Sequence, residues 1–331
     1  MESTMAADMN PPAAAPAFLA AQGWGGAEVV PLAGDASFRR YFRALDAGRS
    51  AVLMDSPPKL EDQRPFVELA RWLTERGFRA PAILAEDAAE GLVLLEDFGD
   101  ARLRETVDAA PESELRLYGD AVDVLIRLRD HPAAPVPAYD RSVYLREVML
   151  LPEWYCPAIG LEVDAPGYRA AWEAVLDTVD GGEAVTVLRD YHAENLMLIE
   201  GEAETLGLLD FQDALAGHPA YDLVSLLQDA RRDVAPALEE AMLDRYRRTT
   251  GVGEDFLDAY HVLGAQRNAK IVGIFARLWQ RDGKPRYAAL CPRVWRYLER
   301  DLAQPVLAPV AAWFDANIPA ELRGDPMQVR A

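Results

Sequence analysis

An aspartate and an asparagine five positions apart, followed by a second aspartate, form the most informative pattern in this chain of 331 residues. Asp190 and Asn195 stand in the run Leu-Arg-Asp-Tyr-His-Ala-Glu-Asn, and Asp210 follows the second of the two apolar stretches that come next. Antiparallel pairing of those stretches brings Asn195 and Asp210 to the same end of a hairpin. Their amide and carboxylate oxygens are hard ligands, which suit a magnesium ion that is also bound by phosphate oxygens.

Asp190 occupies the loop that leads into the same end of the predicted hairpin. A carboxylate there can accept a hydrogen bond from an attacking hydroxyl and orient it toward a phosphorus atom. Phosphoryl transfer needs little more than this positioning and the neutralisation of charge by a metal ion. An Asp and an Asn at this spacing are weak evidence alone, but the loop, the hairpin and the second aspartate together predict phosphoryl transfer from Mg-ATP.

A glycine-containing turn between the first two predicted strands is a second candidate for phosphate binding. Backbone N–H groups in such a turn can face an anion, and guanidinium groups bind phosphate oxygens in pairs. The same pattern also fits a hairpin with a solvated basic strand, and both interpretations stay open. The candidate nucleotide contacts in this segment are Gly34, Asp35, Ser37, Phe38, Arg39 and Arg40.

The elements that must hold these residues fall into two groups, which predict an α+β fold with two lobes. After a flexible leader over residues 1–26, residues 27–97 predict a small sheet with one helix, and residues 98–331 predict a mostly helical lobe. The predicted strands are Val29–Leu32, Phe38–Arg43, Ser50–Met54, Ile83–Glu86, Leu92–Leu95, Val185–Leu188, Leu196–Ile199 and Leu206–Leu209. The predicted helices are Asp62–Arg76, Glu112–Arg129, Tyr168–Val179, Leu238–Thr249 and Phe256–Trp279.

The two lobes are predicted to join just after the apolar strand that ends at Leu95, where turn residues follow. A nucleotide base can lie against Glu96 and Phe98 at such a junction. The segment equally fits an ordinary turn between a strand and a helix, so this assignment rests on its surroundings.

On these residues the chain resembles the aminoglycoside phosphotransferase family, whose fold is similar to that of protein kinases. The resemblance covers most of the chain and is most specific around the loop that carries Asp190. It implies a bilobal protein-kinase-like fold, with Asp190 as the catalytic residue and Asn195 and Asp210 as magnesium ligands. It also implies that Asp222 braces the catalytic loop, and His192 is a further candidate for structural support.

Finer features resemble a narrower group of that family, the anomeric kinases for N-acetylmuramate and N-acetylglucosamine in bacterial cell-wall recycling. The group implies that the C1 hydroxyl of the sugar is the nucleophile and that the product is an α-1-phosphate. ATP, Mg²⁺ and a small sugar are then the expected ligands. The segments that carry this resemblance are Gly34–Tyr41, Val52–Pro58, Leu209–Ala214 and Gln266–Lys270.

The largest departure from the family lies in the third strand, where kinases present a phosphate-binding lysine paired with a helix glutamate. Met54 occupies that neighbourhood, and the whole chain has only three lysines. We expect Arg40 or Arg43 to bind phosphate instead, with Glu68 as a candidate partner, since a guanidinium binds phosphate and carboxylate in bidentate fashion. The short interval between the second aspartate and Asp222 leaves no activation loop, which argues against protein substrates.

The residues that would contact the sugar are selected on weaker grounds. Gln212 and Asp213 directly follow Asp210 and can bind hydroxyls, although Asp213 equally fits a turn cap. Arg267 lies on the apolar face of a late helix, where it can bind a sugar carboxylate or pair with an internal acidic side chain. Tyr155 can stack on a sugar ring or belong to the core.

The composition restricts the partners of the protein. A formal net charge of −20 disfavours nucleic acid, and the longest apolar stretches are too short or too interrupted for a membrane span. Cys156 and Cys291 show neither disulfide nor zinc spacing, which fits the cytoplasm. No obligate protein partner is evident.

Two other functions stay open. A kinase of another hydroxylated metabolite, such as an aminoglycoside or an amino alcohol, would use the same machinery. The charge of its pocket distinguishes the two, because a sugar acid needs a basic contact such as Arg267 or Lys270. A catalytically silent nucleotide sensor is suggested by Met54, but the intact catalytic and metal-binding residues argue against it.

Overall fold

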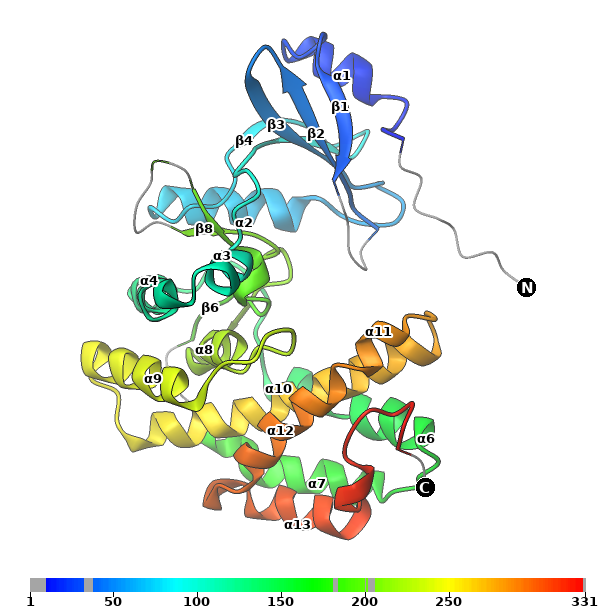
Figure 1. Ribbon diagram of the computed structural model, residues 1–331, viewed down its shortest axis with the longest axis vertical. Coiled ribbons are helices and arrows are strands. Elements are labelled where there is room, and N and C mark those ends of the chain that lie inside the picture. The colour runs from blue at the N-terminus through cyan, green and yellow to red at the C-terminus, as the bar shows by residue number, and fades with distance from the viewer. Residues whose placement is uncertain (1–9, 33–37, 181–183, 200, 202–205, 330–331) are drawn as a thin grey trace. The chain divides into compact units, whose positions relative to one another are not determined.

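The structure is a computed structural model, and it describes residues 10–32, 38–180, 184–199, 201 and 206–329. The chain divides into two compact units (Figure 1). The N-terminal unit comprises Met1–Arg102 and Met197–Asp213, and the C-terminal unit comprises Leu103–Leu196 and Ala214–Ala331. The predicted α+β fold class, with a small sheet in one part and mostly helices in the other, is confirmed.

The N-terminal unit is built on an antiparallel sheet with the strand order β1-β2-β3-β5-β4. Buried Phe42 of β2 pairs directly with buried Leu53 of β3. In β2 the residues on either side of Phe42 are only half-buried, so one face of this strand lies on the core. Burial continues through Met54 in β3 and through the four apolar residues of β5. The elements of the sheet are β1 (Glu28–Leu32), β2 (Arg40–Asp46), β3 (Arg49–Asp55), α2 (Arg64–Glu75), β4 (Ile83–Asp87) and β5 (Leu92–Glu96).

Part of the segment predicted as a flexible leader instead forms helix α1 (Ala15–Ala21). Phe18 and Leu19 of this helix are buried in one cluster with Phe42 and Leu53 of the sheet, so α1 covers the sheet's apolar face (Figure 1). The apolar residues of this segment therefore serve to pack the helix onto the sheet. The Ala and Pro residues around it hid this role in the sequence.

The predicted hairpin is present as the two-stranded sheet of β7 (Leu196–Leu198) and β8 (Leu206–Leu208). It belongs to the N-terminal unit from Met197 onward, whereas the sequence placed it in the helical lobe. The Leu198 N–H donates to the Ala101 carbonyl at 2.7 Å, and the Leu208 N–H donates to the Arg79 carbonyl at 2.7 Å. These backbone hydrogen bonds join the hairpin to the N-terminal unit, a long-range pairing that local sequence does not encode.

Helix α10 (Glu254–Gln280) runs through the C-terminal unit and packs against α8 (Ala220–Leu227) and α12 (Cys291–Leu302) (Figure 1). All eight residues of α8 are buried, so its pattern lacked the two-sided character by which helices are predicted. The short strands β6 (Val185–Val187) and β9 (Leu215–Gly217) pair antiparallel in this unit. The remaining α-helices are α3 (Leu103–Ala109), α4 (Glu114–Arg129), α5 (Arg141–Val148), α6 (Cys156–Ala158), α7 (Ala165–Val175), α9 (Pro236–Thr250), α11 (Pro285–Ala288) and α13 (Ala308–Asn317).

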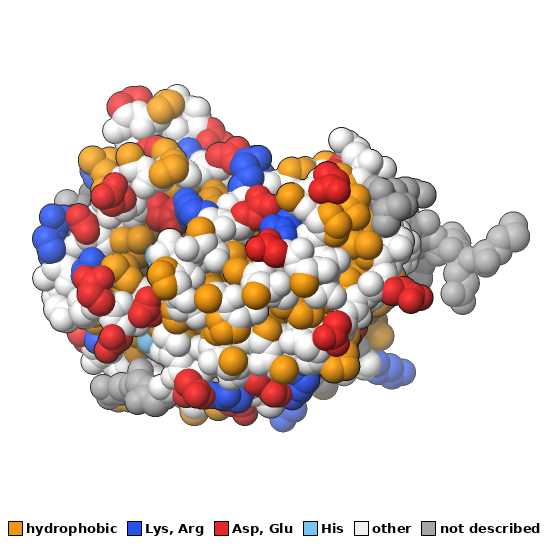
Figure 2. Space-filling view, turned by 90° about the horizontal axis from the view of Figure 1, so that it is seen from below, with side chains coloured by type: hydrophobic (Ala, Val, Ile, Leu, Met, Phe, Trp, Pro, Cys, Tyr) orange, Lys and Arg blue, Asp and Glu red, His pale blue; other side chains and the backbone are white. Residues whose placement is uncertain are grey.

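The surface and the cysteines agree with the composition. On the face that Figure 2 shows, acidic and basic side chains are interspersed, with apolar side chains between them. Cys156 and Cys291 are both free and buried. Within the described ranges, no helix combines the length and apolar character that a bilayer crossing requires.

Candidate active site

The loop that carries Asp190 follows β6 in the C-terminal unit and leads into a single 3₁₀ turn, Ala193–Asn195. Arg189 has a φ of 70°, in the left-handed region that residues other than glycine seldom adopt. Such a conformation costs free energy and persists only where the surroundings hold it. The contacts of this loop are therefore the key to the site.

Asp222, on the first turn of α8, accepts hydrogen bonds from two consecutive backbone N–H groups of the loop. The Leu188 N–H lies 2.6 Å from one carboxylate oxygen, and the Arg189 N–H lies 2.8 Å from the other. Burial raises the pKa of Asp222 to about 7, while these two donors favour its ionised form. One side chain thus fixes the backbone directly before Asp190, the role that the family resemblance implies.

Ser225 and Arg267 hold the same turn from a second side. The Ser225 hydroxyl donates to the Arg189 carbonyl at 3.0 Å, and Arg267 donates to the Ser225 Oγ at 2.8 Å. Arg267 is only 4% exposed, and its charge interacts with the buried carboxylates of Asp222 and Asp229. The structure therefore favours the internal role for Arg267 over the contact with a sugar carboxylate.

Asn195 is oriented by the loop itself. Its side-chain nitrogen donates to the Asp190 carbonyl at 2.9 Å and lies 3.4 Å from Nε2 of His192. Burial and then Arg231 hold the pKa of His192 well below its usual value, so the ring is neutral. Nε2 therefore accepts a hydrogen bond from Arg231, whose Nη1 lies 3.0 Å away. His192 thus supports the asparagine from inside the unit.

Glu147 of α5 holds the Arg189 side chain, a contact that the sequence did not reveal. Its Oε1 accepts from Arg189 Nη2 at 2.6 Å and from Lys270 Nζ at 2.9 Å. Its Oε2 accepts from the Tyr139 hydroxyl and from Gln266 at 3.2 Å. A single glutamate in an unpredicted helix carries no local signal. The helix itself could have been found, because the Asp140 side chain caps it by accepting from the Val143 N–H.

Asp210 lies in the N-terminal unit, two residues after β8, and also has a positive φ, of 58°. Its carboxylate accepts a hydrogen bond from the Gln212 side chain at 2.8 Å. The intervening Phe211 is fully buried and stacks on Phe66 of α2, with the ring centroids 5.0 Å apart. This aromatic anchor fixes the backbone on which Asp210, Gln212 and Asp213 are presented.

Three arginines near the first two strands each have a carboxylate partner: Arg40 and Arg43, which were predicted to replace the missing lysine, and Arg39, a predicted nucleotide contact. Arg40 Nε donates to Asp55 at 2.8 Å, directly across the β2–β3 ladder. Arg39, the most buried of the three, lies 2.9 Å from Glu61. Neither of these two arginines pairs with Glu68, which the sequence analysis had named as a candidate partner. Arg43 likewise bonds the carboxylates of Asp97 and Asp100, at 2.7 and 2.9 Å.

Arg39 differs from the other two arginines in what lies beside it. It hydrogen-bonds Tyr41, whose pKa burial raises to about 12, and the charge of Asp210 also acts on that hydroxyl. Arg39, Tyr41 and Asp210 therefore belong to one electrostatic neighbourhood of the N-terminal unit. The sequence proposed Arg40 or Arg43 as the replacement for the lysine, whereas Arg39 is the arginine that shares the neighbour Tyr41 with the predicted metal ligand.

The other predicted nucleotide contacts have varied surroundings. Phe38 is 64% exposed, and Glu96 forms an ion pair with Arg79 at 2.8 Å. Phe98 is buried, and a side chain at Gly207 would meet its ring at 2.6 Å, so this phenylalanine is packed against the hairpin. Three predicted residues lie outside the described residues: Gly34, Asp35 and Ser37.

Tyr155 corrects the predicted sugar contact, because its side chain is fully buried. Its hydroxyl donates to the Leu322 carbonyl at 2.6 Å and accepts from the Gly324 N–H at 2.9 Å. The ring also packs against Trp295 at 5.3 Å between centroids. Tyr155 therefore anchors the C-terminal segment in the core, the alternative that the sequence left open.

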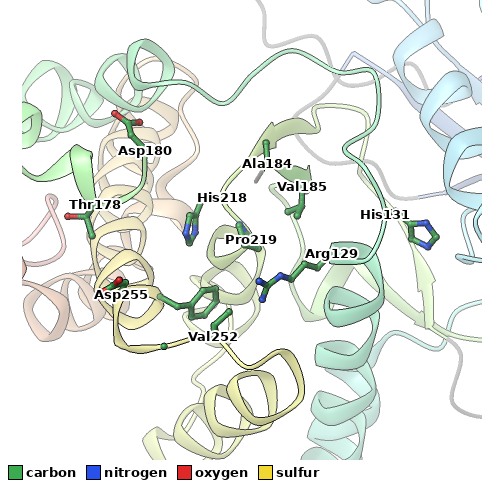
Figure 3. A pocket seen from close by; sticks show the side chains of 12 residues that line it. Arg129, His131, Thr178, Asp180, Ala184, Val185, His218, Pro219, Val252 and Asp255 are labelled. Carbon is green, nitrogen blue, oxygen red and sulfur yellow. The ribbon is translucent and has the colours of Figure 1, made fainter. Parts of the chain in front are cut away.

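A cavity of about 460 Å³ in the C-terminal unit includes none of the predicted site residues (Figure 3). Arg129, His218 and Asp255 lie around it, and Val185 of β6 forms part of its lining. Burial and the charge of Arg129 lower the pKa of His218 to about 4, so its ring is neutral near pH 7. The cavity is lined by Val185, in the strand before Asp190, and by Pro219, just before the helix that carries Asp222, but by neither aspartate.

Comparisons with known proteins identify relatives of this chain. A family model described as "Phosphotransferase enzyme family" matches residues 28–264. A protein of Caulobacter vibrioides named N-acetylmuramate/N-acetylglucosamine kinase is 40% identical over 94% of this chain and 98% of its own. A Pseudomonas aeruginosa protein of the same name is 41% identical over 88% of this chain and 90% of its own.

Solved structures with the same fold are more distant in sequence. A choline/ethanolamine kinase family protein from Mesorhizobium loti superposes with a TM-score of 0.61 at 17% identity, over 90% of this chain and 98% of its own. A streptomycin–ATP–APH(2'')-IIa ternary complex gives a TM-score of 0.59 at 15% identity, over 82% of this chain and 95% of its own. At this identity the likeness concerns the fold alone.

Proposed function

This chain belongs to the phosphotransferase enzyme family, and we propose that it transfers the γ-phosphoryl group of ATP to the C1 hydroxyl of N-acetylmuramate and N-acetylglucosamine. The observation that carries this proposal is its match to four relatives of that name, 37–41% identical over more than four fifths of their lengths. The product would be an α-1-phosphate used in peptidoglycan recycling. The reaction is assigned to the cytoplasm, where ATP is available.

Asp190 has the role of the base that orients the nucleophile. The C1 oxygen forms a bond to the γ-phosphorus while the bond from that phosphorus to the β,γ-bridging oxygen breaks, and ADP leaves. The hydroxyl proton passes to the Asp190 carboxylate. The hydrogen bonds of Asp222 and Ser225 to the neighbouring backbone support this role, because they fix the loop before substrate arrives.

Asn195 and Asp210 are proposed to hold Mg²⁺, and their donor chemistry fits that ion. The nitrogen of Asn195 is directed to the Asp190 carbonyl, so its oxygen is the atom that can coordinate a cation. Asp210 supplies a carboxylate. Magnesium takes its other ligands from water and phosphate oxygens, so two protein ligands are enough. When bound, the ion would neutralise charge on the transferring phosphoryl group.

Arg39 is the proposed phosphate contact in place of the missing lysine. Its ion pair with Glu61 repeats the chemistry of a cation held by a carboxylate, and it lies near the charge of Asp210. A guanidinium presents two parallel donors to phosphate oxygens. Gln212, next to Asp210, is the proposed hydrogen-bonding contact for the sugar hydroxyls.

The proposal is tested by supplying purified protein with Mg-ATP and four acceptors in turn: the two sugars, an aminoglycoside and choline. We expect ADP formation with the sugars only, and a product whose phosphate is stable in alkali and labile in acid. Phosphorus NMR would show coupling to the anomeric proton. Asp190→Asn protein serves as the control for contaminating kinases. Turnover of choline or the aminoglycoside, with neither sugar phosphorylated, would replace the acceptor proposed here, and no turnover at all would favour a nucleotide sensor.

A further inference from the structure

Two cations of the C-terminal unit share a single carboxylate oxygen beside the catalytic loop. Arg189 Nη2 and Lys270 Nζ lie 2.6 and 2.9 Å from Oε1 of Glu147. The other oxygen of Glu147 accepts hydrogen bonds from two neutral side chains, Tyr139 and Gln266. The group bonded to Glu147 therefore contains two positive charges and one negative charge.

Asp190, the residue after Arg189, also acts electrostatically on the Arg189 guanidinium. The positive charges bonded to Glu147 exceed its single negative charge, and they lie in a largely buried place where an added anion is favourable. An anionic group on the acceptor would supply that anion.

Lys270 has donor capacity for such a group. Its ammonium carries three N–H donors, and within the described residues it has two partners, Glu147 and the Tyr221 hydroxyl at 3.3 Å. Solvent reaches both cations, because 12% of the Lys270 side chain and 21% of the Arg189 side chain are exposed. A small anion can therefore approach the pair.

The position of the pair is fixed relative to the reacting atoms. Arg189 immediately precedes Asp190, and its backbone is held by Asp222 and Ser225. If the reacting hydroxyl of a sugar lies at Asp190, an acidic substituent elsewhere on the same ring can reach the side chains beside Asp190, which include Arg189 and Lys270. The other cation considered in this region, Arg267, is buried and donates to Ser225.

We propose that Lys270 and Arg189, held together by Glu147, form the subsite for the carboxylate of an acidic amino sugar. This inference rests on the proposed function, and it adds that the enzyme has a contact used by N-acetylmuramate alone. N-acetylmuramate differs from N-acetylglucosamine by a lactyl ether that bears one carboxylate, so the neutral sugar does not use the subsite.

The experiment compares Lys270→Met with the wild-type chain on both sugars. A charge-assisted hydrogen bond is lost only with the acidic sugar, so kcat/KM for N-acetylmuramate should fall about 10- to 100-fold. The value for N-acetylglucosamine should change less than about threefold. Lys270→Arg should restore most of the activity on the acidic sugar, because it keeps the charge and the donors.

Lys284→Met is the matched control. Lys284 follows the end of α10, and its backbone N–H donates to the carbonyl of Leu278, a residue about 12 Å further along α10 than Lys270. It loses the same charge and should leave the ratio of kcat/KM values for the two sugars unchanged. A change in that ratio as large as the one in Lys270→Met would assign the effect to overall charge and overturn the subsite.

Three further outcomes would overturn the inference while the proposed function stands. One is an equal loss on both sugars in Lys270→Met, which would mean that the lysine only supports the fold. The second is unchanged kcat/KM for N-acetylmuramate, and the third is turnover of the neutral sugar alone by the wild-type chain. Failure of the wild-type chain with both sugars would instead remove the proposed function, and the inference with it.

Discussion

The loop that carries Asp190 and strand β2, which carries Arg40 and Arg43, are stabilised in different ways. The loop around Asp190 is held by buried polar side chains that hydrogen-bond its backbone, among them Asp222 and Ser225. Strand β2 is held by apolar packing through Phe42, and Arg43 on it pairs with the buried carboxylate of Asp97 and the exposed carboxylate of Asp100. Buried hydrogen bonds are costly to break, whereas exposed ion pairs contribute little.

This difference indicates where each region tolerates change. In the loop, removal of one partner leaves another buried group unsatisfied and also releases a backbone turn that is unfavourable by itself. In β2, the shape of the strand survives the loss of a surface charge, so substitutions there should act on ligand binding more than on structure. The following predictions test this contrast, from the largest expected effect to the smallest.

Asp190→Asn should lower kcat by about 10²- to 10⁴-fold, because the amide cannot accept the hydroxyl proton. The substitution keeps the size of the side chain, so ATP binding, followed by fluorescence or calorimetry, should remain close to that of the wild-type chain. A variant with near-full turnover would remove Asp190 from the catalytic role.

Asp222→Asn should lower both activity and stability, because only one oxygen remains to accept two backbone N–H groups. We expect a loss of about 1–3 kcal/mol in the free energy of unfolding and a fall in kcat, with the KM for ATP less affected. Hydrogen exchange should show faster exchange of the Leu188 and Arg189 amides. The control is Asp233→Asn, whose carboxylate is largely exposed and ion-paired with Arg293. Equal effects of the two substitutions would contradict the bracing role.

Arg39→Met should raise the KM for ATP by about tenfold, since it removes the buried guanidinium near Asp210. Arg43→Met is the comparison, and it should change that KM less than about threefold, because the Arg43 guanidinium is already bonded to two carboxylates, those of Asp97 and Asp100. Steady-state kinetics at saturating sugar measures both. A larger effect at Arg43 would move the phosphate contact to that residue.

His218→Asn should make the protein less sensitive to acid, which is the smallest of these effects. Burial and Arg129 lower the pKa of His218 to about 4 in the folded state, while the unfolded chain titrates near 6.5. Protonation of His218 therefore favours unfolding. The stability that the neutral ring contributes is lost as the pH falls from about 6.5 toward 4. Melting temperatures at pH 7.5 and pH 5 should differ less in the variant. An equal or larger fall in the variant would contradict this assignment.

Local patterns in the sequence were sufficient for much of the fold. The strands of the N-terminal sheet were predicted from short runs of residues typical of strands, and α4, α9 and α10 were predicted from their helical periodicity. Two other helices gave no such signal. Helix α8 is buried on every side, and α1 lies in a segment of Ala and Pro whose few large apolar residues pack on the sheet. Packing against the rest of their units, more than their own pattern of residues, stabilises these two helices.

The sequence by itself determined which residues are able to do the chemistry. The spacing of Asp190 and Asn195 on one loop, and of Asp210 after a hairpin, follows from the order of residues along the chain, because short loops and hairpins are local structures. Tertiary structure alone decided what holds them. Glu147 meets Arg189 across 42 positions of the chain, and Asp222 meets the same residue across 33. Such contacts arise from the packing of α5 and α8 around one loop, and no local pattern of residues specifies them.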